Sequence, residues 1–374
     1  MSEWKVYKLG EVVTFQRGFD LPKDKMRNGE YPVAGSNGVI GWHSEYTTKG
    51  PGVTIGRSGN IGTPHFYKSN YWAHNTSLFV KDFKGNDPLF IYYLLKRIDF
   101  KQLNTGSAVP TLNRNHVHDL QVLLPPIDEQ KRIAGVLSSL DDKIDLLNRE
   151  NATLEALAET LFRHYFIENP NPTWKEMPVS YYGKVICGKT PAKKNAEYYG
   201  GEVPFVKIPD MHGKTYVFNS DDTLTKEGQA SQKEKTLPKE SIMVSCIATV
   251  GLVSMNANEV QTNQQINSVV PYYEHYRYYL YCWFKSMYDE LNTMASGGTA
   301  TLNLNTGDFS RIGIPMPDEA KIKEFHLLVE PLFAKTKSNQ QQMQTLAIQR
   351  DTLLPRLMSS EVKVNNKLHI NTLV

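Results

Sequence analysis

The chain has 374 residues, of which 40% are hydrophobic and 22% are charged, and its formal net charge is +3. This composition excludes a mainly disordered or collagen-like chain, and the length favours two or three folded domains. We expect a cytoplasmic protein without a disulfide framework, because no apolar run could span a membrane, no secretory segment follows Met1, and the three cysteines form no CxxC pair.

The sequence repeats itself at domain length. Trp4 lies fourteen residues before Gly18, and Trp174 lies fourteen residues before Gly188. Residues 111–115 (TLNRN) match residues 301–305 (TLNLN), and each copy then reaches prolines, an Asp-Glu pair and a helical pattern. The offset grows from 170 to 190, so the second copy contains an insertion of about twenty residues. We interpret the chain as a tandem duplication of a globular domain followed by a helix.

Each globular part mixes short strands with helices. Residues 51–56 and 241–245 are predicted strands bounded by turns. Residues 88–96 and 276–284 are predicted helices, and abundant Gly, Asn and Ser indicate long loops. The predicted fold class is therefore mixed α/β (α+β).

A coiled-coil pattern runs through residues 129–166. Apolar residues recur every 3.5 positions, with one asparagine on the seam. The seam consists of Ile133, Leu137, Leu140, Ile144, Leu147, Asn151, Leu154, Ala158, Leu161 and Tyr165. At ~1.5 Å per residue, these 38 residues make a helix of roughly 57 Å.

A second, less regular seam follows the second globular part. Its positions are Ile322, Phe325, Val329, Leu332, Thr336, Asn339, Met343, Leu346, Arg350, Leu353 and Leu357. Pro331 is expected to kink this helix or to end its first part. Each helix could pack on its own domain, but we favour antiparallel packing of the two helices as a spacer, because no later apolar element would bury them.

The pattern predicts five segments. They are a globular domain at 1–127, a spacer helix at 128–168, a second globular domain at 169–317, a spacer helix at 318–360 and a tail at 361–374.

Two similar domains held apart by a rigid spacer suit double-stranded DNA, whose groove faces recur along the duplex. Two unequal domains would read an asymmetric, interrupted site, and the spacer would set the gap. At ~3.4 Å per base pair, a 57 Å helix limits the half-site separation to about 17 base pairs.

Longer stretches of the chain resemble the specificity subunit of type I restriction–modification enzymes. These stretches are residues 4–11 (WKVYKLGE), 31–38 (YPVAGSNG), 124–126 (LPP) leading to 129–133 (EQKRI), 154–158 (LEALA) through 161–166 (LFRHYF), and 350–359 (RDTLLPRLMS). Residues 319–322 (EAKI) depart from the pattern, since they lack the glutamine found in residues 129–132 (EQKR).

The resemblance implies a non-catalytic subunit with two target-recognition domains, each reading half of a bipartite site. It implies that the helices dock modification subunits, expected to be two, which hold S-adenosylmethionine and methylate adenine. Restriction subunits with motor and nuclease activity could join the complex. The chain itself is expected to hold no cofactor and no metal.

One motif suggests a nucleotide-binding site instead of a DNA-binding one. Residues 183–190 (GKVICGKT) match the phosphate-loop pattern, which would make the chain a nucleotide-binding enzyme. However, no helical pattern follows, and the first copy lacks the motif. We instead expect Lys189, Lys193 and Lys194 to form a basic loop for DNA phosphates. A duplicated protein-binding adaptor is the remaining alternative.

The candidate DNA-contacting residues are basic or amide side chains in loops. Residues 56–62 (GRSGNIG) would bring Arg57, Ser58 and Asn60 to bases, whereas the second copy has IATVG at 247–251, without arginine. The other candidates are Arg17, Lys23, Arg27, Ser36, Asn37, Lys207, Thr249 and Gln264.

Overall fold

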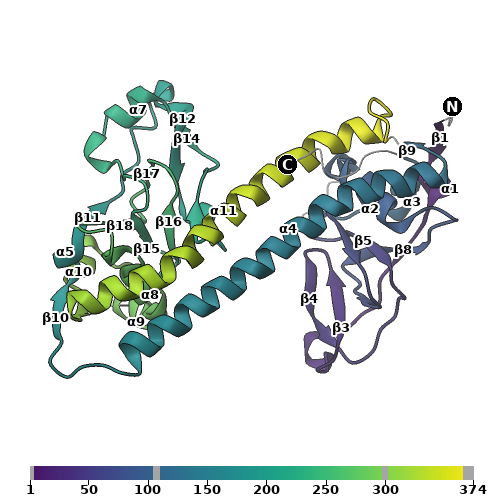
Figure 1. The fold of residues 1–374 in the computed structure, drawn as a ribbon. Coiled ribbons are helices and arrows are strands. Elements are labelled where there is room, and N and C mark those ends of the chain that lie inside the picture. The colour runs from purple at the N-terminus through teal and green to yellow at the C-terminus, as the bar shows by residue number, and fades with distance from the viewer. Residues whose placement is uncertain (1–3, 104–109, 297–301, 365–374) are drawn as a thin grey trace. The chain divides into compact units, whose positions relative to one another are not determined.

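The computed structural model describes residues 4–103, 110–296 and 302–364. The chain divides into two compact units: unit 1 comprises Met1–Ile144 and Thr345–Val374, and unit 2 comprises Asp145–Gln344. The long helices α4 (Ile127–Phe162) and α11 (Glu319–Met358) each contribute one part to unit 1 and another to unit 2 (Figure 1). Within the described residues, no helix is both long and apolar enough to cross a bilayer.

The described residues of unit 1 form three small sheets. Four antiparallel strands pair in the order β2-β8-β5-β6, three strands in the order β4-β3-β7, and β1 pairs with β9. The strands are β1 (Lys5–Lys8), β2 (Thr14–Arg17), β3 (Tyr31–Gly35), β4 (Gly38–His43), β5 (Gly52–Gly56), β6 (Pro64–Tyr67), β7 (Trp72–Ala73), β8 (Ser77–Asp82) and β9 (Gln121–Leu124). The short helices are α1 (Leu9–Val12), α2 (Pro88–Lys96) and α3 (Arg114–His118), with 3-10 turns η1 (Lys23–Lys25) and η2 (Phe100–Leu103).

Unit 2 has the same plan with longer loops. Five strands pair in the order β11-β18-β15-β16-β13, three in the order β14-β12-β17, and β10 pairs with β19. The strands are β10 (Lys175–Pro178), β11 (Gly183–Cys187), β12 (Tyr199–Val206), β13 (Tyr216–Val217), β14 (Thr223–Leu224), β15 (Ile242–Ser245), β16 (Val253–Asn256), β17 (Gln261–Thr262), β18 (Ile266–Pro271) and β19 (Gly313–Met316). The helices are α5 (Val179–Tyr182), α6 (Ile208–Met211), α7 (Lys226–Ala230), α8 (Tyr276–Ser286), α9 (Tyr288–Ala295) and α10 (Thr306–Arg311), with turns η4 (Ala196–Tyr198) and η5 (Lys233–Lys235) and the π-helical turn η3 (Arg163–Ile167) that extends α4.

The predicted duplication is visible in the topology. The order β2-β8-β5-β6 in unit 1 corresponds to β11-β18-β15-β16 in unit 2, and the pair β1–β9 corresponds to β10–β19. Strands predicted at 51–56 and 241–245 form as β5 and β15, and helices predicted at 88–96 and 276–284 form as α2 and α8. The predicted mixed α/β class with two sheet-rich domains linked by long helices is confirmed.

The predicted register of the second TLN motif is wrong by two residues. The amide of Leu112 donates to Arg57 O at 2.9 Å, and the amide of Leu304 donates to Cys246 O at 2.8 Å. Leu112 therefore corresponds to Leu304, an offset of 192, and the asparagine after each leucine caps the next helix, α3 or α10. The error arose because Leu-Asn occurs twice in residues 302–305, and the sequence did not show which leucine is buried.

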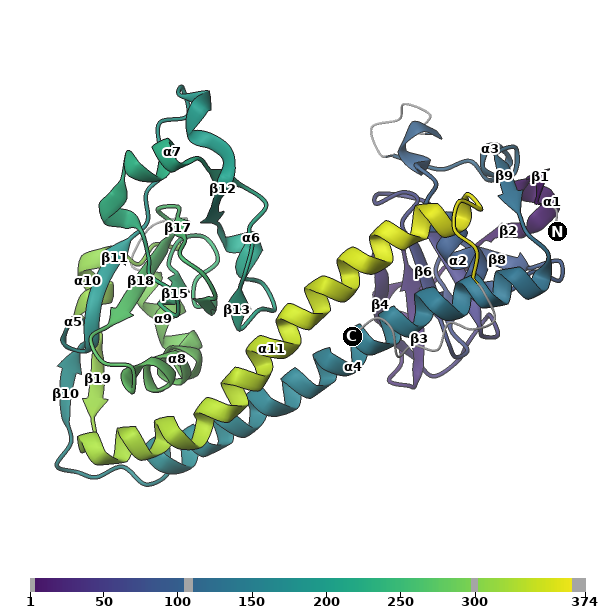
Figure 2. The same cartoon turned by 45° about the horizontal axis from the view of Figure 1, so that its top comes forward.

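The two long helices pack against each other in antiparallel order, as predicted (Figures 1 and 2). In unit 2, Asn339 Nδ2 donates to Asn151 Oδ1 at 2.9 Å, and the Tyr165 hydroxyl donates to Glu324 at 2.9 Å. In unit 1, Arg350 donates to Asp141 at 2.6 Å. Both asparagines lie on the predicted seams and are buried.

The ends of the helices also enter the cores of the units, so packing on the domains occurs as well. Ile133 and Leu137 of α4 and Leu357 of α11 belong to the core of unit 1, together with Phe90 of α2. The core of unit 2 contains the corresponding ends of both helices. Its members include Ala158, Phe162, Ile322, Phe325 and Val329. Most other predicted seam residues are buried or half-buried: Leu140, Ile144, Leu147, Leu154, Leu161, Leu332, Leu346 and Leu353.

The expectation that Pro331 could end a helix is wrong, because α11 runs without interruption from Glu319 to Met358. Pro331 lies on the exposed face, and Leu327, whose carbonyl loses its helical donor, is 69% exposed. Water can therefore satisfy that carbonyl. Phe325, Val329 and Phe333 are buried on the opposite face and hold both sides of the proline in place.

Candidate nucleic-acid interface

Unit 1 has a cavity of about 510 Å³ where three arginines meet. We call it the arginine pocket. It is lined by Arg17, Arg57, Leu78, Thr111, Leu112, Asn113, Arg114 and Asn115. Arg17 ends β2, Arg57 follows β5 and Arg114 begins α3, so three separate parts of the chain each bring one arginine to the cavity. Of the predicted DNA contacts, the pocket brings Arg17 and Arg57 together.

Few nearby carboxylates neutralise the positive charges of the arginines in the pocket. Arg57 is half-buried, and its Nη1 donates to Asn75 O at 3.3 Å. Burial lowers the pKa of Arg57, and the charge of Arg17 lowers it further. Arg17 lies 3.4 Å from the exposed Asp20. Among the described residues, no carboxylate lies within ion-pair distance of Arg57 or Arg114, and the pocket is consequently electropositive.

The loop after β5 is attached to the segment before α3. Ser58 forms a β-bridge with Thr111, and the amide of Gly59 donates to Pro110 O at 3.1 Å. Asn60 is exposed beyond this bridge. Sequence reasoning identified this loop but did not identify Arg114, whose position was matched to the buried Leu304 in the wrong register.

The other candidates in unit 1 lie outside the arginine pocket. Lys23 lies on η1 and Arg27 follows it, both exposed. Ser36 and Asn37 form the turn between β3 and β4, and the Ser36 amide donates to the Thr76 hydroxyl at 3.3 Å. The predicted residues of unit 1 thus fall into more than one group.

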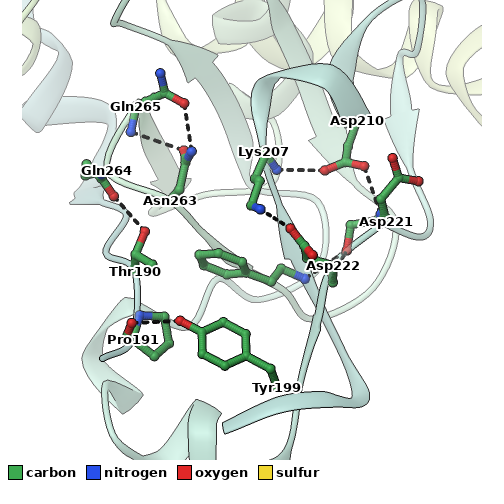
Figure 3. A network of polar contacts seen from close by, with 12 residues as sticks. Thr190, Pro191, Tyr199, Lys207, Asp210, Asp221, Asp222, Asn263, Gln264 and Gln265 are labelled. Carbon is green, nitrogen blue, oxygen red and sulfur yellow. Dashed lines mark hydrogen bonds and ion pairs between the residues drawn. The ribbon is translucent and has the colours of Figure 1, made fainter. Parts of the chain in front are cut away.

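In unit 2, the basic loop and Gln264 are directly connected (Figure 3). The Thr190 hydroxyl donates to Gln264 Oε1 at 2.7 Å, and the amide of Lys189 donates to Thr262 O at 2.9 Å. Lys189, Lys193 and Lys194 are exposed on this loop. These contacts attach the loop that carries the three lysines to the segment that carries Gln264, and lysines with a nearby amide suit a phosphate backbone with neighbouring base edges.

Lys207 and Thr249 are placed differently. The Lys207 ammonium pairs with Asp222, and its backbone amide donates to Asp210 at 2.8 Å (Figure 3). Asp222 thus partly neutralises the charge of Lys207. Thr249 is exposed in the loop between β15 and β16, which corresponds to the loop of Arg57.

Residues 183–190 do not form a phosphate loop. Gly183–Cys187 is the strand β11, paired with β18, and no α-helix follows Thr190 before β12. A Cβ at Gly183 would collide with Val270 O, and a Cβ at Gly188 would collide with Asn263 O. Close packing of the sheet therefore accounts for both glycines of the motif.

The counterpart of the arginine pocket in unit 2 carries no arginine. Cys246 occupies the position of Arg57, and Thr306 that of Arg114. Asn267 occupies the position of Leu78; it accepts from the Thr306 hydroxyl at 2.9 Å and donates to Leu304 O at 3.3 Å. Burial raises the pKa of the Cys246 thiol to about 11, so the side chain that replaces Arg57 is uncharged at neutral pH.

One group of side chains has the composition of a metal site. Ligand atoms of Glu274, His326 and Glu330 lie within 4.8 Å of one another. Arg277, however, already pairs with Glu274 at 2.8 Å, and His326 stacks on Tyr278 with the ring centroids 5.0 Å apart. These contacts account for the group as ion pairing and packing, although the i,i+4 spacing of His326 and Glu330 on α11 was visible in the sequence.

Comparison with known proteins gives one consistent result. The family described as "Type I restriction modification DNA specificity domain" matches residues 1–156 and 171–346. The chain is 34% identical to the type I restriction enzyme HindI specificity subunit of Haemophilus influenzae, over 74% of this chain and 77% of that protein. It is 28% identical to the MjaIX specificity subunit of Methanocaldococcus jannaschii, over 74% of this chain and 69% of that protein.

Among solved structures, the type I restriction–modification S subunit of M. genitalium matches with a TM-score of 0.64. The match covers 96% of each chain at 16% identity, so it supports a shared fold.

Proposed function

Because this chain belongs to the family of type I restriction–modification DNA specificity subunits, we propose that its two units read the two halves of a bipartite site in double-stranded DNA. As the specificity subunit, it is a non-catalytic part of a type I complex that binds DNA. The methyl transfer to adenine, with S-adenosylmethionine, would belong to the modification subunits. We place the complex in the cytoplasm, with the DNA.

The difference between the two candidate surfaces is the observation that carries the proposal. The loop after β5 carries Ser58 and Asn60 in unit 1, whereas Ile247 and Thr249 stand at the corresponding positions after β15 in unit 2. Two domains of one fold with different polar side chains at corresponding positions would recognise different half-sites. An asymmetric site follows from this difference.

The long helices would set the gap and dock two modification subunits. Several apolar side chains remain exposed on them: Leu146 (49%), Leu157 (46%), Leu327 (69%) and Ile348 (66%). Exposed apolar residues on a helix suit a protein partner better than they suit DNA. Restriction subunits could join the same assembly.

Footprinting tests this proposal. The purified complex with its modification subunits should protect two short tracts that flank an unprotected, sequence-neutral gap. Methylome sequencing of cells with and without the gene should return the same bipartite motif. Uniform, weak and salt-sensitive binding without a motif would contradict it.

A further inference from the structure

We propose that the arginine pocket of unit 1 binds a phosphodiester group of the DNA backbone, and that unit 2 has no equivalent contact. This inference rests on the proposed function and assigns a chemical role to one site within it.

The charges of the pocket favour an anion. Three arginines line one cavity, and only Arg17 has a described carboxylate nearby, at 3.4 Å on the exposed Asp20. Like charges that share a partly desolvated cavity repel one another. A phosphodiester would neutralise this repulsion, and its oxygens match the paired donors of a guanidinium group.

The depth of Arg57 favours a phosphate over a base edge. An arginine that reads guanine has to protrude into the major groove. Arg57 is instead half-buried, and the Asn75 carbonyl holds its Nη1 at 3.3 Å. A recessed guanidinium can be reached only by a group that projects from the duplex. Phosphates project from the duplex, whereas base edges lie inside the grooves.

The surrounding contacts make the pocket a fixed receptor. The amide of Leu112 donates to Arg57 O at 2.9 Å, which ties the segment before α3 to the loop after β5. The Asn113 side chain accepts from the Asn115 amide at 2.9 Å and so fixes the backbone that carries Arg114. These two hydrogen bonds therefore fix the backbones of Arg57 and Arg114 relative to each other before any ligand binds, which lowers the ordering cost of binding.

The counterpart in unit 2 could not take the same group. The positions of Arg17, Arg57 and Arg114 are taken in unit 2 by Cys187, Cys246 and Thr306. Asn267 also forms hydrogen bonds there with the Thr306 hydroxyl and with Leu304 O. Salt dependence that originates in the pocket would consequently belong to the half-site of unit 1.

The test uses the complete complex with its modification subunits on its own duplex. Binding is measured by fluorescence anisotropy over a series of NaCl concentrations for wild type, for the double variant Arg57→Gln/Arg114→Gln, and for the control Arg97→Gln. Arg97 is an exposed arginine of unit 1 that does not line the pocket. Melting curves of all three proteins check that each remains folded.

We expect the double variant to bind about 10–100-fold more weakly at low salt. The slope of log K against log salt should fall in magnitude by about 0.9, corresponding to one phosphate. Base preference should be unchanged at every position, and Arg97→Gln should retain more of the wild-type affinity than the double variant does.

A second arm identifies the phosphate. Methylphosphonate is placed at single backbone positions of the half-site read by unit 1. One position should weaken the wild-type complex and leave the double variant unaffected. If the double variant shows a relaxed preference at one base pair and an unchanged salt slope, the proposal is overturned in favour of base reading. An equal loss of wild-type affinity at all methylphosphonate positions would overturn it as well. A wild-type complex that recognises no bipartite DNA would instead contradict the proposed function itself.

Discussion

Glu240 joins three elements of unit 2. Its carboxylate lies 2.8 Å from Arg277 of α8 and 2.8 Å from Lys337 of α11, and it precedes β15. Burial acts to raise the pKa of Glu240, but Lys337 and Arg277 outweigh burial, so the pKa is lowered. The charged form is therefore the one that stabilises the fold.

We predict that Glu240→Gln lowers the free energy of unfolding by about 1–3 kcal/mol at pH 7. A lowered pKa in the folded state contributes stability above the pKa of the unfolded chain, near 4.3, and this contribution is lost as pH falls through the folded value. Melting temperatures of wild type and variant should therefore converge in acid, as the pH falls through the lowered pKa of Glu240. The exposed pair of Arg163 and Glu168 provides the control, since Glu168→Gln should cost less than about 1 kcal/mol. A difference that persists in acid would contradict the role of the charge.

Individual contacts show where sequence reasoning ends. The turn residues at 56–62 were recognisable as a loop bearing Arg57, because glycines bracket polar side chains. The pairing of Lys207 with Asp222 could not be recognised from the sequence, because it depends on how the loop between β12 and β14 folds back. Contact of Arg57 and Lys207 with DNA stays a prediction. We expect Lys207 to contribute less to DNA binding than Arg57, because Asp222 partly neutralises its charge.

At the scale of elements, the pair Asn151–Asn339 is one buried polar point of a largely apolar seam. Asn339 Nδ2 also donates to Glu150 at 3.1 Å, so it has two acceptors. Sequence periodicity placed both asparagines on their seams and left open whether they meet. They do meet, and a buried polar pair of this kind favours one register of two helices over shifted ones.

We predict that Asn339→Leu lowers the free energy of unfolding by about 1–3 kcal/mol, because it leaves the buried Asn151 Oδ1 without its donor. The double variant Asn151→Leu/Asn339→Leu should recover most of this loss, since both polar groups are removed together. Thermal unfolding of the wild type, both single variants and the double variant gives the coupling energy directly. Strictly additive effects would show that the two side chains do not depend on each other.

Helices were easier to predict than strands for a physical reason. The heptads of α4 and α11 extend over many turns, whereas β7, β13, β14 and β17 contain two residues each and carry no periodic signal. Such short strands are defined by their partners in the sheet. The prediction that Pro331 could end the helix was wrong because a proline on an exposed helix face destabilises the helix less than one in the core.

At the scale of the molecule, the recognition unit is not one continuous stretch of chain. Leu357 and Met358 of α11 belong to the core of unit 1, together with Ile133 and Leu137 of α4. The segment division into 1–127, 128–168, 169–317, 318–360 and 361–374 stays a proposal. An exchange of residues 1–127 for another recognition domain must therefore preserve the surface that contacts these helix ends.

Helix length is the variable that tests the spacer. We predict that seven residues inserted after Leu147 in α4, matched by seven after Met343 in α11, lengthen the tolerated gap by about three base pairs. Seven residues are one heptad, so they add about 10.5 Å and keep the apolar seams facing each other. Neither half-site should change. The control places the same seven residues in the exposed linker at Asn169–Asn171, where the gap should stay as in wild type. A binding selection from duplexes with gaps of every length reads out the result, and a gap that stays constant in the helix variant would exclude α4 and α11 as the determinant of spacing.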